Sequence, residues 1–469
     1  LKGTDGKLNV LFDENGVETS REIRTKPVPG NNVVLTIDAA WQKRAEKILS
    51  ENVRRGAFVV MNVRTGEVMV LASNPTFDPN VWFPSISTED KEKLDSDPAK
   101  PMLCRASQSA YPPASTFTIA VALAALQTGP ISPYTLIPGP PTYAVGNRVF
   151  KNWNKNHEGD LDVAKAIARS CNTWFYRVGI MTGAWPIIDV AGRFGLGKKV
   201  GLPLSGEVTG QVPSQAWADK YRNGRFMGGD IANMAIGQGA LLVTPVQMAQ
   251  FMAGVANGTY LPEAKIIKQV QDVRNNVVRV PRSGSPRRLD VGLDVLMAAR
   301  KGMTDVVNSP YGTAKRARLD GVEEVKIAGK TGTGQWRIAL EQNVAWFTGF
   351  VPADNPEDSF SLLSEGRPGE KVSGGGSAAP LVSQFFSPIY NEKLREEEER
   401  IDEDKKRLLA LLQAESERNA QERSASEAQA AERAALQQQS QGIDAADRES
   451  AEAERRALLD QVARRIEGE

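Results

Sequence analysis

Metal-binding side chains are scarce in this sequence. Its 469 residues include one histidine, His157, and two cysteines, Cys104 and Cys171. Zinc, haem and iron-sulfur centres draw mainly on histidine and cysteine ligands, and no carboxylate loop typical of a calcium site is present. We therefore expect no metal and no cofactor. Two cysteines are also too few for a disulfide scaffold, and their spacing does not tell whether they pair.

An excess of charge of one sign is also missing. The chain has 58 Lys and Arg against 57 Asp and Glu, a net charge of +1. A dedicated nucleic-acid-binding domain is usually strongly basic, so we expect no nucleic-acid partner. The balance hides a split, because residues 391–469 carry 21 acidic and 14 basic residues and the rest of the chain is basic. The two parts are therefore read separately.

Long hydrophobic runs are the third absence. Residues 106–147 and 231–262 contain no charge, but Gly, Pro, Asn and Gln interrupt both, so neither holds about 20 consecutive apolar residues. We interpret them as interior segments of a water-soluble domain. With 41% hydrophobic residues, the chain has enough apolar material for a large core and two or three domains.

The hydrophobic patterns predict a sheet with helices packed on it. Residues 1–32 are polar and turn-rich, which is typical of a connector or the end of an upstream domain. Two apolar strands flank Arg64-Thr65-Gly66 within residues 56–73 and predict a hairpin. The other expected strands are residues 32–38, 325–336 and 345–351, and, more weakly, 360–363. The expected helices are residues 39–53, 117–127 with its start at Ser115, 161–179 and 245–256. The fold class is therefore α/β (α+β), with an at least partly antiparallel sheet.

The composition changes sharply after Tyr390. Glu, Arg, Ala, Gln and Leu dominate, Pro is absent, and no Gly occurs before Gly442. The segment is a long charged helix, a weak coiled coil or disordered. A heptad stripe is not sustained beyond the patch Leu408, Leu409, Leu411 and Leu412. We favour a solvated helical tail over a partner-binding coiled coil.

Three short motifs contain the side chains that could carry chemistry. The first is Tyr-Pro-Pro-Ala-Ser ending at Ser115, where a helix N-terminus would stabilise negative charge beside a nucleophile, although taken alone Ser115 is more simply an N-cap. The second is Ser170-Cys171-Asn172, a hydroxyl and a carboxamide two residues apart. The third is Lys330-Thr331-Gly332-Thr333, which offers positive charge and a glycine that lets a substrate backbone lie close to the strand. It is not a phosphate loop, because Glu324 stands where that motif needs glycine.

In order and spacing these motifs resemble those of the class B penicillin-binding proteins, most closely the penicillin-binding protein 2 group, whose SxxK, SxN and KTG motifs follow in this order. The second and third match outright. The resemblance covers residues 33–390 and implies the penicillin-binding-protein transpeptidase, or serine β-lactamase-like, fold: an antiparallel sheet flanked by helices. Residues 1–32 would then be the end of the non-catalytic pedestal, and residues 391–469 the charged helical or disordered tail.

The resemblance also implies roles for individual residues. Ser115 would be the acylated nucleophile, Ser170 a proton shuttle and Lys330 the electrostatic partner of the site. Asn172, Thr331, Gly332 and Thr333 would bind the substrate, with Thr333 on its carboxylate. The backbone N–H groups of Ser115 and Thr333 would form the oxyanion hole. Acyl transfer of this kind needs no cofactor.

One position departs from the family pattern. The SxxK lysine is expected three residues after Ser115, where this chain has Thr118. The resemblance implies that this lysine takes the serine proton, and a hydroxyl has no comparable basicity near neutral pH. The leading hypothesis is a serine D,D-transpeptidase of peptidoglycan synthesis. The main alternative is an inactive scaffold or binding subunit of the same fold. A β-lactamase or β-lactam sensor is a third hypothesis, which needs the same lysine.

The resemblance finally implies partners and a location. The donor would be the D-Ala-D-Ala end of a peptidoglycan stem peptide, and β-lactams would mimic it. The protein would work with a membrane glycosyltransferase of cell-wall elongation. It would lie on the periplasmic side of the bacterial cytoplasmic membrane, attached through an N-terminal anchor outside this sequence.

Overall fold

An antiparallel sheet of five strands, in the order β14-β15-β16-β4-β5, lies at the centre of the computed structural model, which describes residues 2–281, 284 and 286–466. Its strands are β4 (Arg55–Asn62), β5 (Val68–Asn74), β14 (Ala328–Arg337), β15 (Gln342–Val351) and β16 (Asp358–Glu365). Every neighbouring pair is antiparallel. The predicted hairpin forms, and Gly66 supplies the positive φ (+74°) that its turn requires. The pairing of β4 with β16 joins the two ends of the domain into one sheet.

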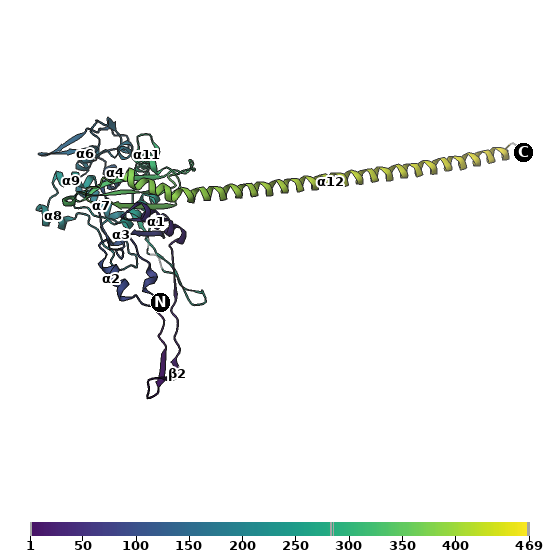
Figure 1. The fold of residues 1–469 in the computed structure, drawn as a ribbon. Coiled ribbons are helices and arrows are strands. Elements are labelled where there is room, and N and C mark those ends of the chain that lie inside the picture. The colour runs from purple at the N-terminus through teal and green to yellow at the C-terminus, as the bar shows by residue number, and fades with distance from the viewer. Residues whose placement is uncertain (1, 282–283, 285, 467–469) are drawn as a thin grey trace. The chain divides into compact units, whose positions relative to one another are not determined.

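Helices pack on this sheet, and Figure 1 labels many of them. The α-helices before the tail are α1 (Ala39–Asn52), α2 (Thr88–Ser96), α3 (Arg105–Gln108), α4 (Thr118–Thr128), α5 (Val163–Arg169), α6 (Asn172–Thr182), α7 (Ala184–Arg193), α8 (Gln215–Arg222), α9 (Gly228–Ala235), α10 (Pro245–Asn257) and α11 (Leu293–Asn308). Shorter turns are η1 (Pro79–Trp82), η2 (Ala114–Phe117), η3 (Lys315–Ala317), η4 (Ile338–Leu340) and the π-helical η5 (Gly374–Ala378). The predicted fold class, a sheet flanked by helices, is confirmed.

Local sequence explains where the main helices begin. The Asp38 carboxylate accepts the Trp41 N–H at the start of α1. Thr244 and Gln247 form a capping box at the start of α10, with a proline at its first position. Along α4 every side chain from Thr118 to Leu126 is buried, as expected for a helix without a polar face.

Two sequence-based helix predictions need correction. The first helical turn at Ser115 is the 3-10 turn η2, and α4 itself starts only at Thr118. The helix predicted over residues 161–179 is two helices, α5 and α6, because Ser170 adopts a left-handed conformation (φ +52°) between them. Hydrophobic periodicity continues across this break, so the sequence pattern did not reveal it.

Small strands outside the central sheet complete the unit. Residues 1–32, predicted to be a connector or the end of an upstream domain, contain a hairpin of β1 (Lys7–Phe12) and β2 (Glu18–Thr25). The predicted strand β3 (Asn32–Leu35) pairs with β11 (Ile267–Gln271), which also pairs with β12 (Val277–Arg279). The remaining strands are β6 (Ile137–Pro138), β7 (Thr142–Val145), β8 (Arg148–Lys151), β9 (Asp160–Leu161), β10 (Tyr260–Leu261) and β13 (Arg287–Arg288).

The last helix, α12 (Ala379–Ile466), changes character along its length. Phe385, Phe386 and Tyr390 are buried in the aromatic core with Phe58 and Phe360. The chain divides into two units near this point, Leu1–Asn391 and Glu392–Glu469.

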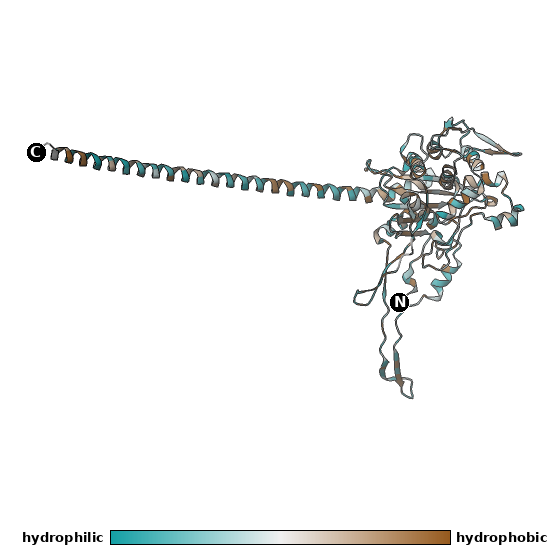
Figure 2. Ribbon diagram, turned by 180° about the vertical axis from the view of Figure 1, so that it is seen from behind, coloured by the Kyte–Doolittle hydropathy of each residue, from teal (hydrophilic) through white to brown (hydrophobic). Residues whose placement is uncertain are grey.

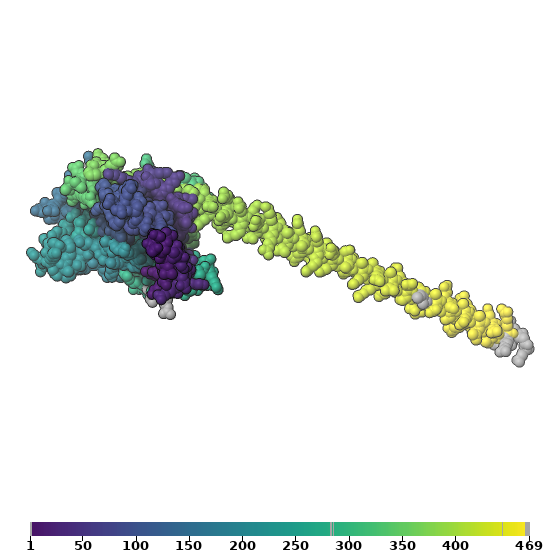
Figure 3. Space-filling view, turned by 60° about the horizontal axis from the view of Figure 1, so that its bottom comes forward, coloured from purple at the N-terminus to yellow at the C-terminus, as the bar shows by residue number. Residues whose placement is uncertain are grey.

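In the second unit, residues 392–466 are part of this one helix, and Figure 2 shows that most of them are hydrophilic. Figure 3 draws the same segment with all its atoms. From Arg395 onward every side chain that the structure describes is exposed, including Leu408, Leu409, Leu411 and Leu412. Its helical stability must come from local propensity and from ion pairs such as Asp402 with Lys406. In the described part of the chain no helix combines the length and apolar character needed to cross a membrane.

Candidate active site

All three motifs line one cleft of about 470 Å³. Of the sequence-predicted residues, Ser115, Ser170, Asn172, Thr331 and Thr333 line it. Lys330 and Gly332 are buried directly behind its wall, as neighbours of Thr331 on β14. A larger hollow of about 560 Å³ lies beside β11 and β12 and contains none of the motif residues. We therefore place the candidate site in the smaller cleft.

Glycines on β14 let the Ser115 segment lie against the strand. A Cβ on Gly332 would be 3.0 Å from Pro113 O, and one on Gly334 would be 3.0 Å from the Ala114 Cβ. The segment is also tied from behind, because Ala114 donates its N–H to Gly237 O at 2.9 Å. Any side chain at Gly237 would collide with Ala114 O, at 2.0 Å. These close approaches position Ser115 beside Thr333.

A buried charged cluster holds the residues just before Ser115. The Tyr111 hydroxyl donates to Glu365 Oε1 at 2.6 Å, and Arg105 Nε lies 3.4 Å from the same oxygen. Burial and the neighbouring Glu365 carboxylate raise the pKa of Tyr111, so it remains a hydrogen-bond donor. Trp346 adds a hydrogen bond to Pro112 O at 2.9 Å. Sequence analysis missed this cluster, because Tyr111 and Glu365 are 254 residues apart and meet only in the folded sheet.

Thr118 faces its own backbone. It is 1% exposed, and its hydroxyl donates to Ser115 O at 2.7 Å. A threonine hydroxyl bonded back to the preceding turn is a common local arrangement. The Ser115 hydroxyl makes no hydrogen bond to any other residue that the structure describes.

Lys330 and Ser170 form the most direct contact between motifs. The Lys330 ammonium donates to Ser170 Oγ at 2.8 Å and to Thr331 O at 3.0 Å. Lys330 is completely buried, and this loss of hydration lowers its pKa to about 7. The left-handed turn at Ser170 ends α5 and turns its hydroxyl toward β14.

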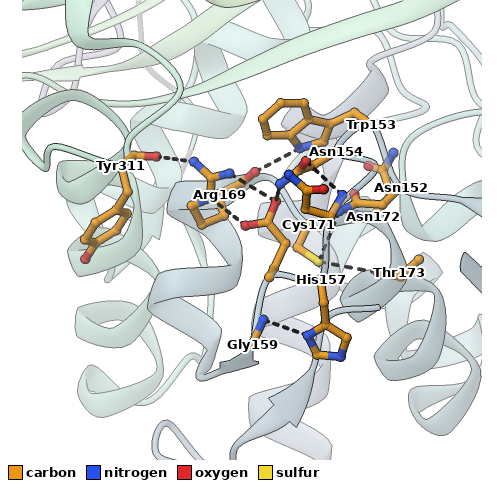
Figure 4. A network of polar contacts seen from close by, with 12 residues as sticks. Asn152, Trp153, Asn154, His157, Gly159, Arg169, Cys171, Asn172, Thr173 and Tyr311 are labelled. Atoms are coloured by element: carbon orange, nitrogen blue, oxygen red, sulfur yellow. Dashed lines mark hydrogen bonds and ion pairs between the residues drawn. The ribbon is translucent and has the colours of Figure 1, made fainter. Parts of the chain in front are cut away.

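A polar network supports the second motif from outside (Figure 4). Arg169 forms an ion pair with Glu158, with Nε and Oε2 2.8 Å apart, and lies 5.3 Å from the centre of the Trp153 ring. Burial acts to raise the pKa of Glu158, but hydrogen bonds from Arg169 and Asn154 lower it below its usual value. The Asn172 N–H donates to Asn152 Oδ1 at 3.0 Å. Trp153 and Arg169 also line the cleft, although neither was predicted as a site residue from the sequence.

The opposite wall comes from η5 and the loop after α11. Gly374 donates its N–H to the Thr333 hydroxyl at 3.1 Å, and the Thr313 and Thr331 hydroxyls are 2.9 Å apart. These contacts orient two of the predicted substrate-binding hydroxyls. The other lining residues not predicted from sequence are Gly312, Thr313, Ser373, Gly375 and Gly376.

The single histidine lies outside the cleft. His157 Nδ1 accepts the Gly159 N–H at 2.9 Å (Figure 4).

The Cys171 thiol lies in the second motif, and burial raises its pKa. Within the part of the chain that the structure describes, no three His, Cys, Asp or Glu side chains are grouped to hold a metal ion.

Comparison with known proteins agrees with the fold. The family model of the penicillin binding protein transpeptidase domain matches residues 56–387. The peptidoglycan D,D-transpeptidase MrdA of Haemophilus influenzae is 31% identical over 415 residues, covering 84% of this chain and 61% of that protein. The chain therefore spans about three fifths of the length of this relative.

Two solved structures are similar over most of this chain. One is Pseudomonas aeruginosa PBP2 in complex with WCK 5153, with a TM-score of 0.69 and 32% identity over 77% of this chain and 79% of that chain. The other belongs to a peptidoglycan synthase complex that coordinates polymerization and crosslinking, with a TM-score of 0.69 and 30% identity over 82% of this chain and 67% of that chain. This chain belongs to the penicillin-binding protein transpeptidase family, in its class B penicillin-binding protein 2 group.

Proposed function

We propose that this protein is a serine D,D-transpeptidase of peptidoglycan synthesis, with Ser115 as the residue that is acylated. The observation that carries the proposal is the one cleft lined by Ser115, Ser170 and Thr333, with Lys330 buried behind its wall and bonded to Ser170. A nucleophile, a second hydroxyl and an amine bonded to that hydroxyl are groups that acyl transfer uses. Similar proteins carry the same activity in their names.

The substrate follows from the chemistry of the walls. We infer that the cleft binds the D-Ala-D-Ala end of a stem peptide, with its carboxylate near Thr333 and its backbone along Thr331 and Gly332. Asn172 would hold the donor amide from the other side. The N–H groups of Ser115 and Thr333 would receive the negative charge of the tetrahedral intermediate. A β-lactam presents the same carboxylate and a strained amide.

The partner and location belong to the same proposal. We propose that the protein works with a membrane glycosyltransferase of cell-wall elongation on the periplasmic side of the cytoplasmic membrane. The similarity to a chain of a peptidoglycan synthase complex supports this partner. Residues 1–32 would lie at the end of the pedestal through which the transpeptidase domain is held.

A second candidate, a non-catalytic scaffold of the same family, is favoured by Thr118. The hydroxyl of Thr118 is already bonded to Ser115 O, so no amine stands at the position of the SxxK lysine. In this candidate the cleft still binds anionic ligands, because Lys330 and Thr333 are present. Replacing Lys330 by Ala should then weaken equilibrium binding of a penicillin at pH 6 by about 10- to 100-fold, as loss of a charge-assisted contact predicts.

Intact mass after incubation with a penicillin distinguishes the two candidates. The transpeptidase proposal predicts an increase by one penicillin mass in the wild type and none in Ser115→Ala. Reversible binding without any mass increase would support the scaffold. An adduct that persists in Ser115→Ala would assign acylation to another residue.

A further inference from the structure

Acylation of Ser115 needs a group that accepts its proton, and this chain has no amine at the usual place. Thr118 holds that position, and its hydroxyl is engaged with Ser115 O at 2.7 Å. That oxygen belongs to the Ser115 backbone, and no described residue forms a hydrogen bond with the Ser115 hydroxyl. The acceptor must therefore come from another wall of the cleft. This inference rests on the proposed acyl transfer.

Lys330 supplies an amine that contacts a hydroxyl of the site. Its Nζ is 2.8 Å from Ser170 Oγ, and Ser170 lines the same cleft as Ser115. Lys330 is completely buried and Ser170 is 8% exposed, so bulk water has little access to the contact. A hydroxyl bonded to an amine can pass on a proton from a second hydroxyl in the same cleft, because it donates and accepts at once, and catalytic hydrogen bonds often form only when substrate binds.

We propose that Lys330, acting through the Ser170 hydroxyl, is the proton acceptor for Ser115 in this chain. Lys330 would thus act as the general base in place of the missing SxxK lysine, in addition to its electrostatic role. Ser170 would connect the base to the nucleophile.

The proton and electron pairs balance without a further reactant. The Ser115 proton moves to Ser170 Oγ, and the Ser170 proton moves to the neutral Nζ of Lys330. Ser115 Oγ forms a bond to the donor carbonyl carbon, and the C–N bond of the terminal amide or the β-lactam breaks. The leaving nitrogen then takes a proton back along the same route. Nothing is oxidised or reduced.

The surroundings of Lys330 allow the neutral amine at physiological pH. Burial lowers its pKa to about 7, so about half of the molecules carry a neutral amine at that pH. Of the elements packed against β14, only α11 carries charged side chains, because β15, η2 and η5 contain none. On α11, Lys301 binds Asp305 at 2.8 Å, Arg300 donates to backbone carbonyl oxygens, and Asp294 lies in the first turn. Among the described residues, Lys330 Nζ forms hydrogen bonds to a hydroxyl and a backbone oxygen, and neither is a carboxylate that would hold its proton.

The test is the pH dependence of Ser115 acylation by a penicillin, measured as intact mass against time. In the wild type the second-order rate should rise with pH and level off above a midpoint near 7. Lys330→Arg keeps the positive charge but cannot lose its proton. We expect it to lower the rate at pH 8 by about 100-fold or more and to abolish the rise.

Two further variants keep the test decisive if Lys330→Arg does not fold. Ser170→Ala leaves the buried amine in place and removes the connecting hydroxyl, so it should also lose the rise with pH. The variant Thr118→Lys supplies its own amine. In that variant, adding Lys330→Arg should lower the acylation rate by a smaller factor than it does in the wild type. Circular dichroism melting of each variant confirms that it is folded.

The outcomes separate this inference from the proposed function. If Ser115 is acylated in Lys330→Arg or Ser170→Ala at a rate that rises with pH as in the wild type, Lys330 is not the proton acceptor, but the proposed acyl transfer is retained. The same conclusion follows if the wild-type acylation rate does not change between pH 5 and 9. Absence of a Ser115 adduct at every pH overturns both.

Discussion

Replacing Thr118 by lysine should accelerate penicillin acylation of Ser115. Residues three apart in a helical turn lie on the same face, so an amine at position 118 would be placed close to Ser115. Thr118 is 1% exposed, so burial would lower the pKa of the new amine and favour its neutral form. A general base contributes about 10²- to 10⁴-fold, or roughly 3–5 kcal/mol of activation free energy.

The substitution also has a cost in stability. It removes the hydrogen bond from Thr118 to Ser115 O, worth about 0.5–1.5 kcal/mol, and forces a longer side chain into a packed site, at about 1–3 kcal/mol. Thr118→Met is the matched control, because methionine adds similar length without an amine. We expect both variants to melt at a lower temperature and only the lysine variant to react faster.

The assay is the second-order rate of adduct formation at pH 8, followed by intact mass for the wild type, Thr118→Lys and Thr118→Met. A lysine variant that reacts at the wild-type rate, while still folded, would refute the argument that the missing amine limits acylation. An equal acceleration in Thr118→Met would assign the effect to packing.

Three other predictions concern stability. Glu365→Ala should destabilise the fold by about 3–5 kcal/mol, because Arg105 stays buried without its carboxylate partner. Glu365→Gln still accepts a hydrogen bond from Tyr111 and should destabilise the fold less. Equal denaturant midpoints for the two variants would contradict this prediction. The lysine at position 330 keeps its proton up to a pH of about 10.5 in the unfolded chain, but only up to about 7 in the folded chain. Between these values the wild type therefore loses folding stability as the pH falls, by up to about 1.4 kcal/mol per pH unit. Lys330→Met does not titrate, so its stability relative to the wild type should rise as the pH falls from about 10 to 7. A difference that does not change with pH would show that Lys330 is not desolvated. Deleting residues 395–469 should change the melting temperature of the remaining chain by less than about 2 °C, because the described side chains of this segment are exposed. The helical circular dichroism signal should fall. A melting temperature lower by many degrees would overturn the boundary near Tyr390.

The motif residues could be predicted from the sequence because each lies in a short local pattern. Ser170 and Lys330 stand in recognisable triplets, and their order along the chain indicated the family. The local pattern could not reveal that Ser170 would break a helix with a left-handed turn, because periodicity reports which residues are apolar and does not report φ. It also could not reveal Trp153, which enters the cleft through its contact with Arg169.

The buried contact between Tyr111 and Glu365 behind the site likewise could not be predicted from a local sequence pattern. Glu365 was near a weakly predicted strand, and nothing in its neighbourhood marked it as a partner of Tyr111. The sheet order β15-β16-β4 brings it there, since strands distant in sequence become neighbours only when the sheet closes. Position 118 is the opposite case, in which the sequence identified the change but only the fold shows its consequence. With Thr118 bonded to the backbone, the one buried amine that contacts a motif hydroxyl among the described residues is that of Lys330 on β14. The proposed transpeptidase chemistry therefore depends on whether a proton can move from Ser115 across the cleft to that strand.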